Sequence, residues 1–319
     1  MRTLLLAITV YTLPSYAFPV GVEVPYGSEQ FELCWQAVPE AEQYAVYNSP
    51  AFIGSYVFAN LVSGLSSTHS RPSLPGREFF YVVALDANNE VIESSDTVGC
   101  YYLRDFQFPE GRAKSVPFAL GKLEYRVTGS SACSSFSADI TTQPSSIIRN
   151  QAMPGGFTTA DRVVTQNGGA FAYRVAPAGN WTGSLETTSA MALGQAFFFA
   201  SIHDSPPPII TGCAQSGYAP AGTVSIASGV QAATPIGFPI VDAHHVGLMG
   251  LETCGLRRGT FTSADMVVEQ ISGRSAFILP NGNWRGTLDT CYPEYAYYII
   301  NRPHDNGAWT YDIATVGFP

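Results

Sequence analysis

Apolar and polar residues alternate over short stretches of this chain, and each stretch ends at glycine, proline, asparagine or serine. Residues 31–35, 123–127 and 223–226 show this alternation. A period of two places side chains on one face of a β-strand. No amphipathic helical pattern follows residue 17, and 30 glycines and 22 prolines supply frequent turns. The pattern predicts an all-β protein whose antiparallel strands form sandwiches or barrels.

The first 17 residues have the pattern of an export signal. Arg2 supplies one positive charge, an apolar run follows from Leu4 to Tyr11, and Ser15-Tyr16-Ala17 ends with small residues at the cleavage positions. The apolar run is shorter than the roughly 20 residues that a membrane span requires. We therefore expect a signal peptide at 1–17 and a secreted protein, extracellular or at the cell surface, that is not an integral membrane protein.

The second half of the chain contains one sequence pattern twice. Blocks at 156–166, 170–171, 179–187 and 197–204 return in the same order at 259–270, 276–277, 282–290 and 297–305. Repetition at a fixed spacing indicates tandem modules. We predict two homologous β-rich modules at 122–216 and 217–319, preceded by a linker at 104–121 that is rich in proline, glycine and charge. The modules loosely resemble uncharacterised tandem modules of exported bacterial proteins.

Residues 22–103 carry aromatic and turn residues at characteristic places. Trp35 lies on one predicted strand and Tyr44 on the next, and Leu74-Pro75-Gly76 precedes a long apolar strand. In these positions the segment resembles a fibronectin type III domain, in which this Trp packs under this Tyr. The resemblance implies a β-sandwich over 18–103. The family's corner tyrosine is replaced by Phe79, so the hydroxyl bond of that corner is absent.

Six cysteines in an exported chain indicate disulfides, because that compartment is oxidising. None has the CxxC spacing of a zinc or redox site. Six cysteines allow 15 pairings. Keeping each pair within one module favours Cys34–Cys100, Cys133–Cys213 and Cys254–Cys291. Two separate buried thiols are the alternative for the first pair.

The charge pattern narrows the class of partner. Charged residues make up 13% of the chain, the net charge is −9, and no basic cluster exists, which argues against nucleic acid. A surface of uncharged polar residues and tyrosine tolerates close self-association. We expect partners among further copies of the chain, cell-surface or matrix components, and glycans.

Two tryptophans are the first candidates for ligand binding. Trp181 and Trp284 follow Gly-Asn and precede glycine in the two copies. A loop Trp can stack on a sugar through its apolar face. Recurrence beside the same turn residues instead favours a Trp that caps each module's core.

The most metal-like cluster is Asp242, His244 and His245. Two imidazoles and a carboxylate could bind zinc within one loop. The cluster occurs in the second copy alone and lacks the HxxxH or HExxH spacing. We therefore expect ordinary loop or interface residues here.

Some polar residues are shared by both copies. Asp161 and Asp265 follow the same short motif, and a turn Asp often binds nearby backbone amides. His203-Asp204 and His304-Asp305 recur after an aromatic strand. Neighbouring strand residues point to opposite faces, so a role at the strand end is favoured over catalysis.

The chain lacks the sequence signatures of common enzymes. There is no GxSxG elbow, phosphate loop or dinucleotide fingerprint. We predict no catalytic residues and no cofactor. The sequence favours a secreted structural or adhesive protein, such as a cell-surface, matrix or filament subunit. A carbohydrate-binding module array is the first alternative and a secreted hydrolase the second.

Overall fold

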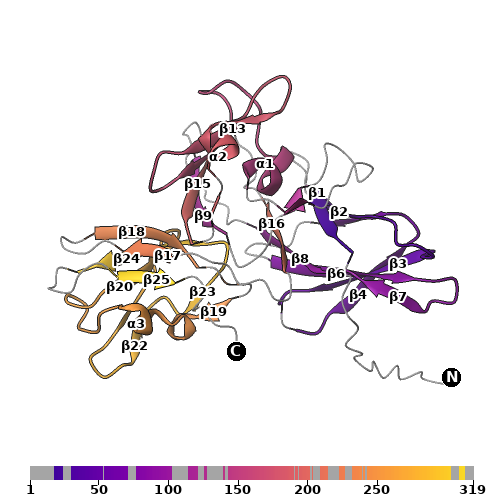
Figure 1. Ribbon diagram of the computed structural model, residues 1–319. Helices are drawn as coiled ribbons and strands as arrows, with labels where there is room; N and C mark the ends of the chain where they lie inside the picture. Colours follow the sequence, from indigo (N-terminus) through magenta and orange to yellow (C-terminus); the bar gives the residue numbers. More distant parts are fainter. Residues whose placement is uncertain are drawn as a thin grey trace.

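The chain folds into antiparallel β-sheets joined by turns and very short helices, as the alternation of its apolar residues predicts (Figure 1). The all-β prediction is confirmed, and none of the described sheets closes into a barrel. The computed structural model describes residues 18–23, 30–52, 54–70, 77–102, 114–120, 126–127, 139–140, 143–189, 191–192, 194–201, 203, 209–214, 223–226, 232–238, 240, 243–302 and 309–312. The expected signal peptide lies outside these residues.

The N-terminal part is a sandwich of two sheets. One sheet has the order β1-β2-β5, and the other has the order β16-β8-β6-β3-β4, with β7 paired to β6. The bounds are β1 (Val20–Glu23), β2 (Gln30–Trp35), β3 (Gln43–Ser49), β4 (Val57–Val62), β5 (Ser66–Ser70), β6 (Arg77–Leu85), β7 (Val91–Ser94), β8 (Thr97–Tyr102) and β16 (Ile209–Ala214).

A hydrophobic core fills the space between these two sheets. The Trp35 and Tyr44 rings lie 5.5 Å apart within it, as the fibronectin resemblance implies, while the family assignment itself stays a prediction. The Tyr44 hydroxyl accepts a hydrogen bond from the Val38 amide at 2.9 Å. Phe79 points the other way, into the core of the first repeat module, where its ring contacts Phe52. An apolar ring at the corner position therefore joins the sandwich to its neighbour.

The two repeat modules have the same architecture. The first contains a sheet of order β9-β15-β12-β13-β14, and the second has β18-β24-β20-β21-β22. The bounds are β9 (Lys114–Ala119), β12 (Arg162–Thr165), β13 (Phe171–Arg174), β14 (Trp181–Thr182) and β15 (Ala196–Ser201), and then β18 (Ala232–Gly237), β20 (Met266–Glu269), β21 (Ser275–Ile278), β22 (Trp284–Gly286) and β24 (Ala296–Asn301). Each sheet has its own buried core.

The register of these sheets corrects two sequence-based predictions. β9 is a sheet strand, so residues 114–119 are not part of a linker. Ala172 pairs with Val163 as Ala276 pairs with Val267, so Ala276-Phe277 corresponds to Ala172-Tyr173 and not to Ala170-Phe171. The sequence match had followed the Ala-Phe dipeptide, which in the first copy lies two residues before the equivalent position.

Strand β16 connects the first module back to the sandwich. It follows β15 in the chain, yet it pairs along its whole length with β8 of the sandwich. The corresponding pair in the second module is β17 (Thr223–Ile226) with β25 (Trp309–Asp312), which forms a separate two-stranded ribbon. The sandwich and the first module therefore share a sheet and are not separate units joined by a linker.

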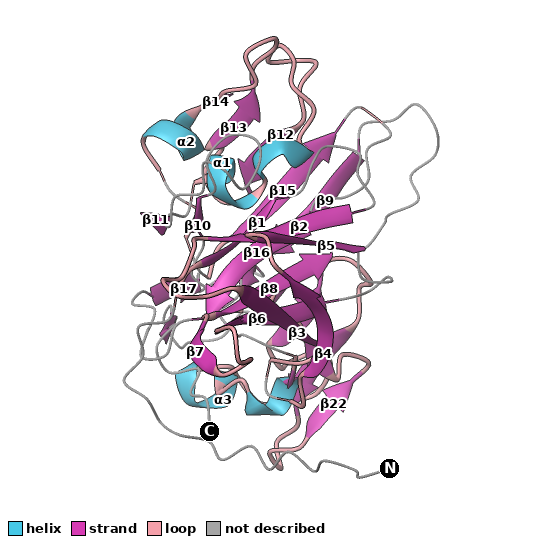
Figure 2. Cartoon of the chain, turned by 90° about the vertical axis from the view of Figure 1, so that its right-hand side faces the viewer, coloured by secondary structure: helices cyan, strands magenta, loops and turns pink. Residues whose placement is uncertain are grey.

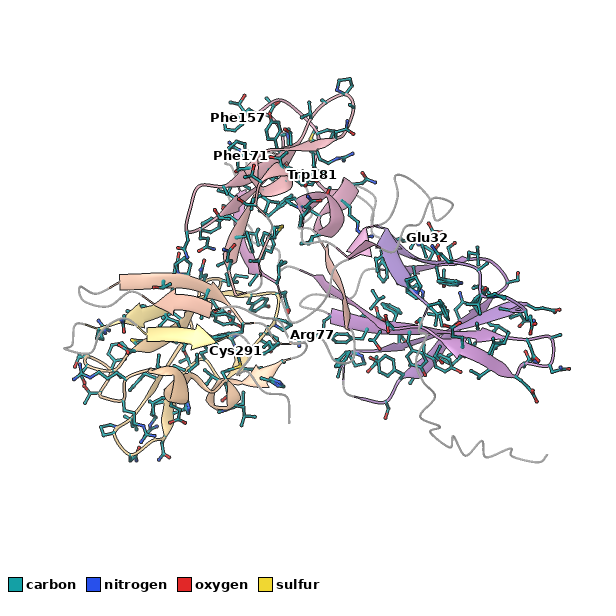
Figure 3. All side chains as sticks on the ribbon, viewed as in Figure 1. Glu32, Arg77, Phe157, Phe171, Trp181 and Cys291 are labelled. Atoms are coloured by element: carbon teal, nitrogen blue, oxygen red, sulfur yellow. The ribbon has the colours of Figure 1, made fainter. Side chains whose placement is uncertain are left out.

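The two modules meet around an approximate two-fold relation. The Gln166 and Gln270 carboxamides, at equivalent positions, donate to each other at 2.9 Å in both directions. The Ala119 amide donates to the Glu294 carbonyl, and the Gly237 amide makes the matching bond to the Gly194 carbonyl. Arg77 of the sandwich lies over the Tyr292 ring at 4.6 Å, so all three parts of the molecule are in contact (Figure 3).

The remaining elements are short. They are β10 (Arg126–Val127), β11 (Asp139–Ile140), β19 (His244–His245), β23 (Thr290–Cys291), α1 (Pro144–Ile147), α2 (Ser184–Thr187), α3 (Leu251–Cys254), η2 (Arg149–Gln151) and η3 (Val246–Leu248). Figure 2 shows α1 and α2 beside β13 at one end of the molecule and α3 at the other. No helix among the described residues is long and apolar enough to span a membrane.

Candidate functional site

The aspartates shared by both modules are buried, and each accepts a hydrogen bond from a backbone amide. Asp161 and Asp265 are fully buried, and their Oδ2 atoms accept from the amides of Met153 at 2.7 Å and Arg257 at 2.9 Å. Burial raises the pKa of Asp161, while the nearby Ser201 side chain, the hydrogen bond from the Met153 amide and the charge of His203 act to lower it. Both carboxylates fix the chain segment that precedes their own strand. A role within the fold, as expected from the motif, therefore accounts for them.

His203 belongs to the same polar region of the first module. Its Nε2 lies 2.9 Å from the Thr159 carbonyl oxygen, and its amide is bonded to the Ser201 hydroxyl. These contacts place it at the end of β15, as predicted. Asp204 and the His304-Asp305 pair lie outside the described residues.

Trp181 and Trp284 both pack against the core of their module, as expected. The Trp181 indole N–H donates to the Arg149 carbonyl at 3.1 Å. The Trp284 indole N–H is buried and has no hydrogen-bond partner among the described residues. The same residue type therefore has two different environments in the two copies.

The metal-like cluster separates in the structure. His244 and His245 form β19, and adjacent strand residues point to opposite faces. His244 Nδ1 lies 3.1 Å from the Ala243 carbonyl oxygen, whereas His245 Nε2 lies 3.2 Å from Asp289 Oδ1. Asp242 is outside the described residues. Within the described part of the chain, no group of three or more potential metal ligands occurs.

Of the three predicted disulfides, the structure tests the pair in the second module. Cys291 is a free, buried thiol, so the expected Cys254–Cys291 disulfide is wrong in this structure. Burial raises the pKa of the Cys291 thiol, which keeps it protonated. The Cys34–Cys100 and Cys133–Cys213 pairings stay predictions, because the side chains of Cys100, Cys133 and Cys213 are not described. Cys213 lies on β16 opposite Val98, within the sheet of the sandwich.

A pocket of about 720 Å³ opens beside Trp284 in the second module. Its polar lining comes from the loop before β22, from β22 itself, from His245 of β19 and from Asp289, which directly precedes β23. The polar and aromatic lining residues are His245, Asn281, Asn283, Trp284, Arg285 and Asp289. The His245 side chain is half exposed, and that of Asp289 is 83% exposed. His245 Nδ1 also accepts from the Gly247 amide at 3.1 Å, which orients the ring toward Asp289.

Strand β4 is the second candidate site. It ends the larger sheet of the sandwich and, among the described strands, pairs with β3 alone. Val57, Phe58 and Leu61 are 60%, 58% and 46% exposed. Its sequence contains no charged residue. An exposed, apolar and uncharged edge strand is a surface on which another strand can pair.

Sequence reasoning identified Trp284 and His245 but missed their neighbours. Asp289 belongs to a shared block, where it corresponds to Glu186, so it looked like a residue of the fold. Asn283 was interpreted only as a turn residue beside Trp284, and Asn281 was not considered. Comparing the partners of Glu186 and Asp289 would have distinguished them, and those partners are visible only in three dimensions.

Comparisons with known proteins leave the structure as the basis for function. No protein-family model matches this chain, and neither a curated protein nor a solved structure does so.

Proposed function

We propose that this chain is a secreted, non-catalytic structural or adhesive subunit that associates with further copies of itself through strand β4. The observation that carries the proposal is the uncharged, exposed edge of the sandwich at Val57–Val62. Monomeric proteins usually protect such an edge strand with charged residues, proline or a covering loop. β4 contains neither a charged residue nor proline, and although a bulge at Ala59 interrupts its register with β3, the strand stays open to a partner strand.

The surface next to β4 is also suited to association. The Phe58 ring contacts Tyr47 at 5.9 Å, and Tyr47 stacks on Tyr81 at 4.9 Å. Tyr56 contacts Tyr81 from the other side at 5.0 Å. Aromatic rings therefore continue from the edge strand across the outer face of the sheet. Aromatic side chains are enriched where protein surfaces meet.

A second copy is the partner that the strand fits best. Two β4 strands can pair antiparallel about a two-fold axis, because each then presents the same row of backbone groups to the other. Pairing would extend the six-stranded sheet across both molecules and cover Phe58 and Leu61. An elongated assembly needs a further contact elsewhere, whereas β4 pairing by itself yields a dimer.

Light scattering on the secreted chain tests this proposal. The mass should rise from monomer to dimer with concentration, and Leu61→Lys should shift the transition to at least tenfold higher concentration. Val91→Lys is the matched control, because Val91 is 63% exposed on β7, which pairs with β6 and is not part of the β4 edge. A monomer at all concentrations, or an equal effect of both variants, would overturn the proposal.

A further inference from the structure

The pocket of the second module lies where the first module is closed by its own chain. In the first module, Glu186 accepts from the Ser145 amide at 3.1 Å and from the Ser145 hydroxyl at 2.5 Å. The Trp181 N–H is bonded to the Arg149 carbonyl. The segment that contains α1 and η2 therefore satisfies both the acidic residue and the tryptophan.

The equivalent groups in the second module are not satisfied in this way. Asp289 takes the place of Glu186, since both lie three residues after the close-packed glycines Gly183 and Gly286. The Asp289 carboxylate extends into solvent and contacts His245, and the Trp284 N–H has no partner among the described residues. In the first module, the segment with α1 and η2 therefore closes this place. In the second module, the same place is an open pocket.

We propose that this pocket binds one sugar residue of a neutral glycan. Its lining combines a carboxylate, two carboxamides, a guanidinium and an imidazole around one aromatic ring. Neighbouring hydroxyls of a sugar both donate and accept, so they match paired amide and carboxylate groups. The C–H face of a sugar packs on the apolar part of an indole. The volume falls in the range of about 300–1,000 Å³ that is usual for small-molecule sites.

The composition of the lining argues against other ligands. Arg285 and Asp289 carry opposite charges, so the pocket does not favour an anion. A calcium site requires at least six oxygen ligands, and a zinc site requires at least three protein ligands. Glycoside hydrolysis usually needs two carboxyl groups flanking the bond, and Asp289 is the single acidic residue of the lining. The pocket is therefore suited to holding a sugar rather than cleaving it.

Titration with simple sugars tests the inference. The probes are the methyl glycosides of glucose, galactose, mannose and N-acetylglucosamine, followed by saturation-transfer NMR and by tryptophan fluorescence. At least one should bind saturably, and Asp289→Ala should weaken that binding tenfold or more. Asn283→Ala should weaken it as well, because its side chain is exposed and contributes to the lining.

The first module supplies the control. Glu186→Gln changes the equivalent residue outside the pocket and should leave sugar binding unchanged. Circular dichroism should show that all three variants are folded. Absence of saturable binding by every probe, or binding that survives Asp289→Ala and Asn283→Ala in folded protein, would overturn the inference. Neither result depends on β4, so the dimerisation proposal is tested separately.

Discussion

Replacing the two buried aspartates by asparagine should affect the two modules differently. Asp265 uses both oxygens, because Oδ2 accepts from the Arg257 amide at 2.9 Å and Oδ1 from the Arg302 amide at 2.8 Å. Asparagine has one acceptor oxygen, so in Asp265→Asn one amide would face an NH₂ group. A buried donor left unsatisfied costs about 1–3 kcal/mol, and hydrogen bonds to charged groups lie at the upper end of such costs. We expect a loss of about 2–3 kcal/mol in the second module.

The same change in the first module should cost less. Asp161 accepts from the Met153 amide through Oδ2, and an asparagine oxygen can keep that bond. Burial already disfavours the charged form, as the raised pKa of Asp161 shows, so losing the charge removes an unfavourable contribution. The Oδ1 atom of Asp161 has no hydrogen-bond partner among the described residues, so replacing that atom breaks no bond there. We expect Asp161→Asn to change stability by less than about 1 kcal/mol.

Native-state hydrogen exchange measures the two effects separately, which a single unfolding transition of a multi-module chain does not. The free energy of opening should fall for amides of β20 and β24 in Asp265→Asn and stay nearly constant for β12 and β15 in Asp161→Asn. Equal losses in the free energy of opening in both variants would refute the argument, which rests on how many hydrogen bonds each aspartate accepts.

Three further predictions concern other parts of the structure. Because the pKa of Asp161 is raised in the folded state, its contribution to the free energy of unfolding is fully present below the unfolded pKa. That contribution is lost as pH rises through the folded pKa. Urea unfolding at a series of pH values should show this loss in the native chain and not in Asp161→Asn. Gly237→Ala should destabilise the module interface by about 1–3 kcal/mol, since the added Cβ would lie 2.4 Å from the Ala119 Cβ, whereas Gly64→Ala has nothing within 4 Å and should be near neutral by thermal unfolding. Cys291 should resist iodoacetamide in native protein and react after denaturation, as mapped by peptide mass spectrometry; an oxidised Cys291 would contradict the free thiol.

The all-β class and the repeat could be predicted because both depend on local pattern. Period-two alternation determines which strand face is buried, and the paired Gly-Asn-Trp blocks mark the same turn twice. The contact between Trp35 and Tyr44 was expected from the resemblance of this segment to a fibronectin type III domain. These features require only that each strand bury its own apolar face.

Features that depend on distant partners were missed. Residues 114–119 looked like a linker because of Pro117, yet β9 ends its sheet, and an edge strand tolerates proline. Pro235 has the equivalent position in β18, opposite Tyr298 as Pro117 is opposite Phe198, and this shared proline could have revealed the strand. The pocket had no such signal. Its opening depends on which segment covers Asp289 and Trp284, and that is decided by tertiary packing.

Association through β4 is the central claim, and concentration-dependent hydrogen–deuterium exchange tests it most directly. Among residues 57–62, the amides that point away from β3 should exchange more slowly as protein concentration rises, because a partner strand then accepts their hydrogen bonds. Amides of β7 should exchange at the same rate throughout. Unchanged exchange in β4 from dilute to concentrated protein would contradict the account.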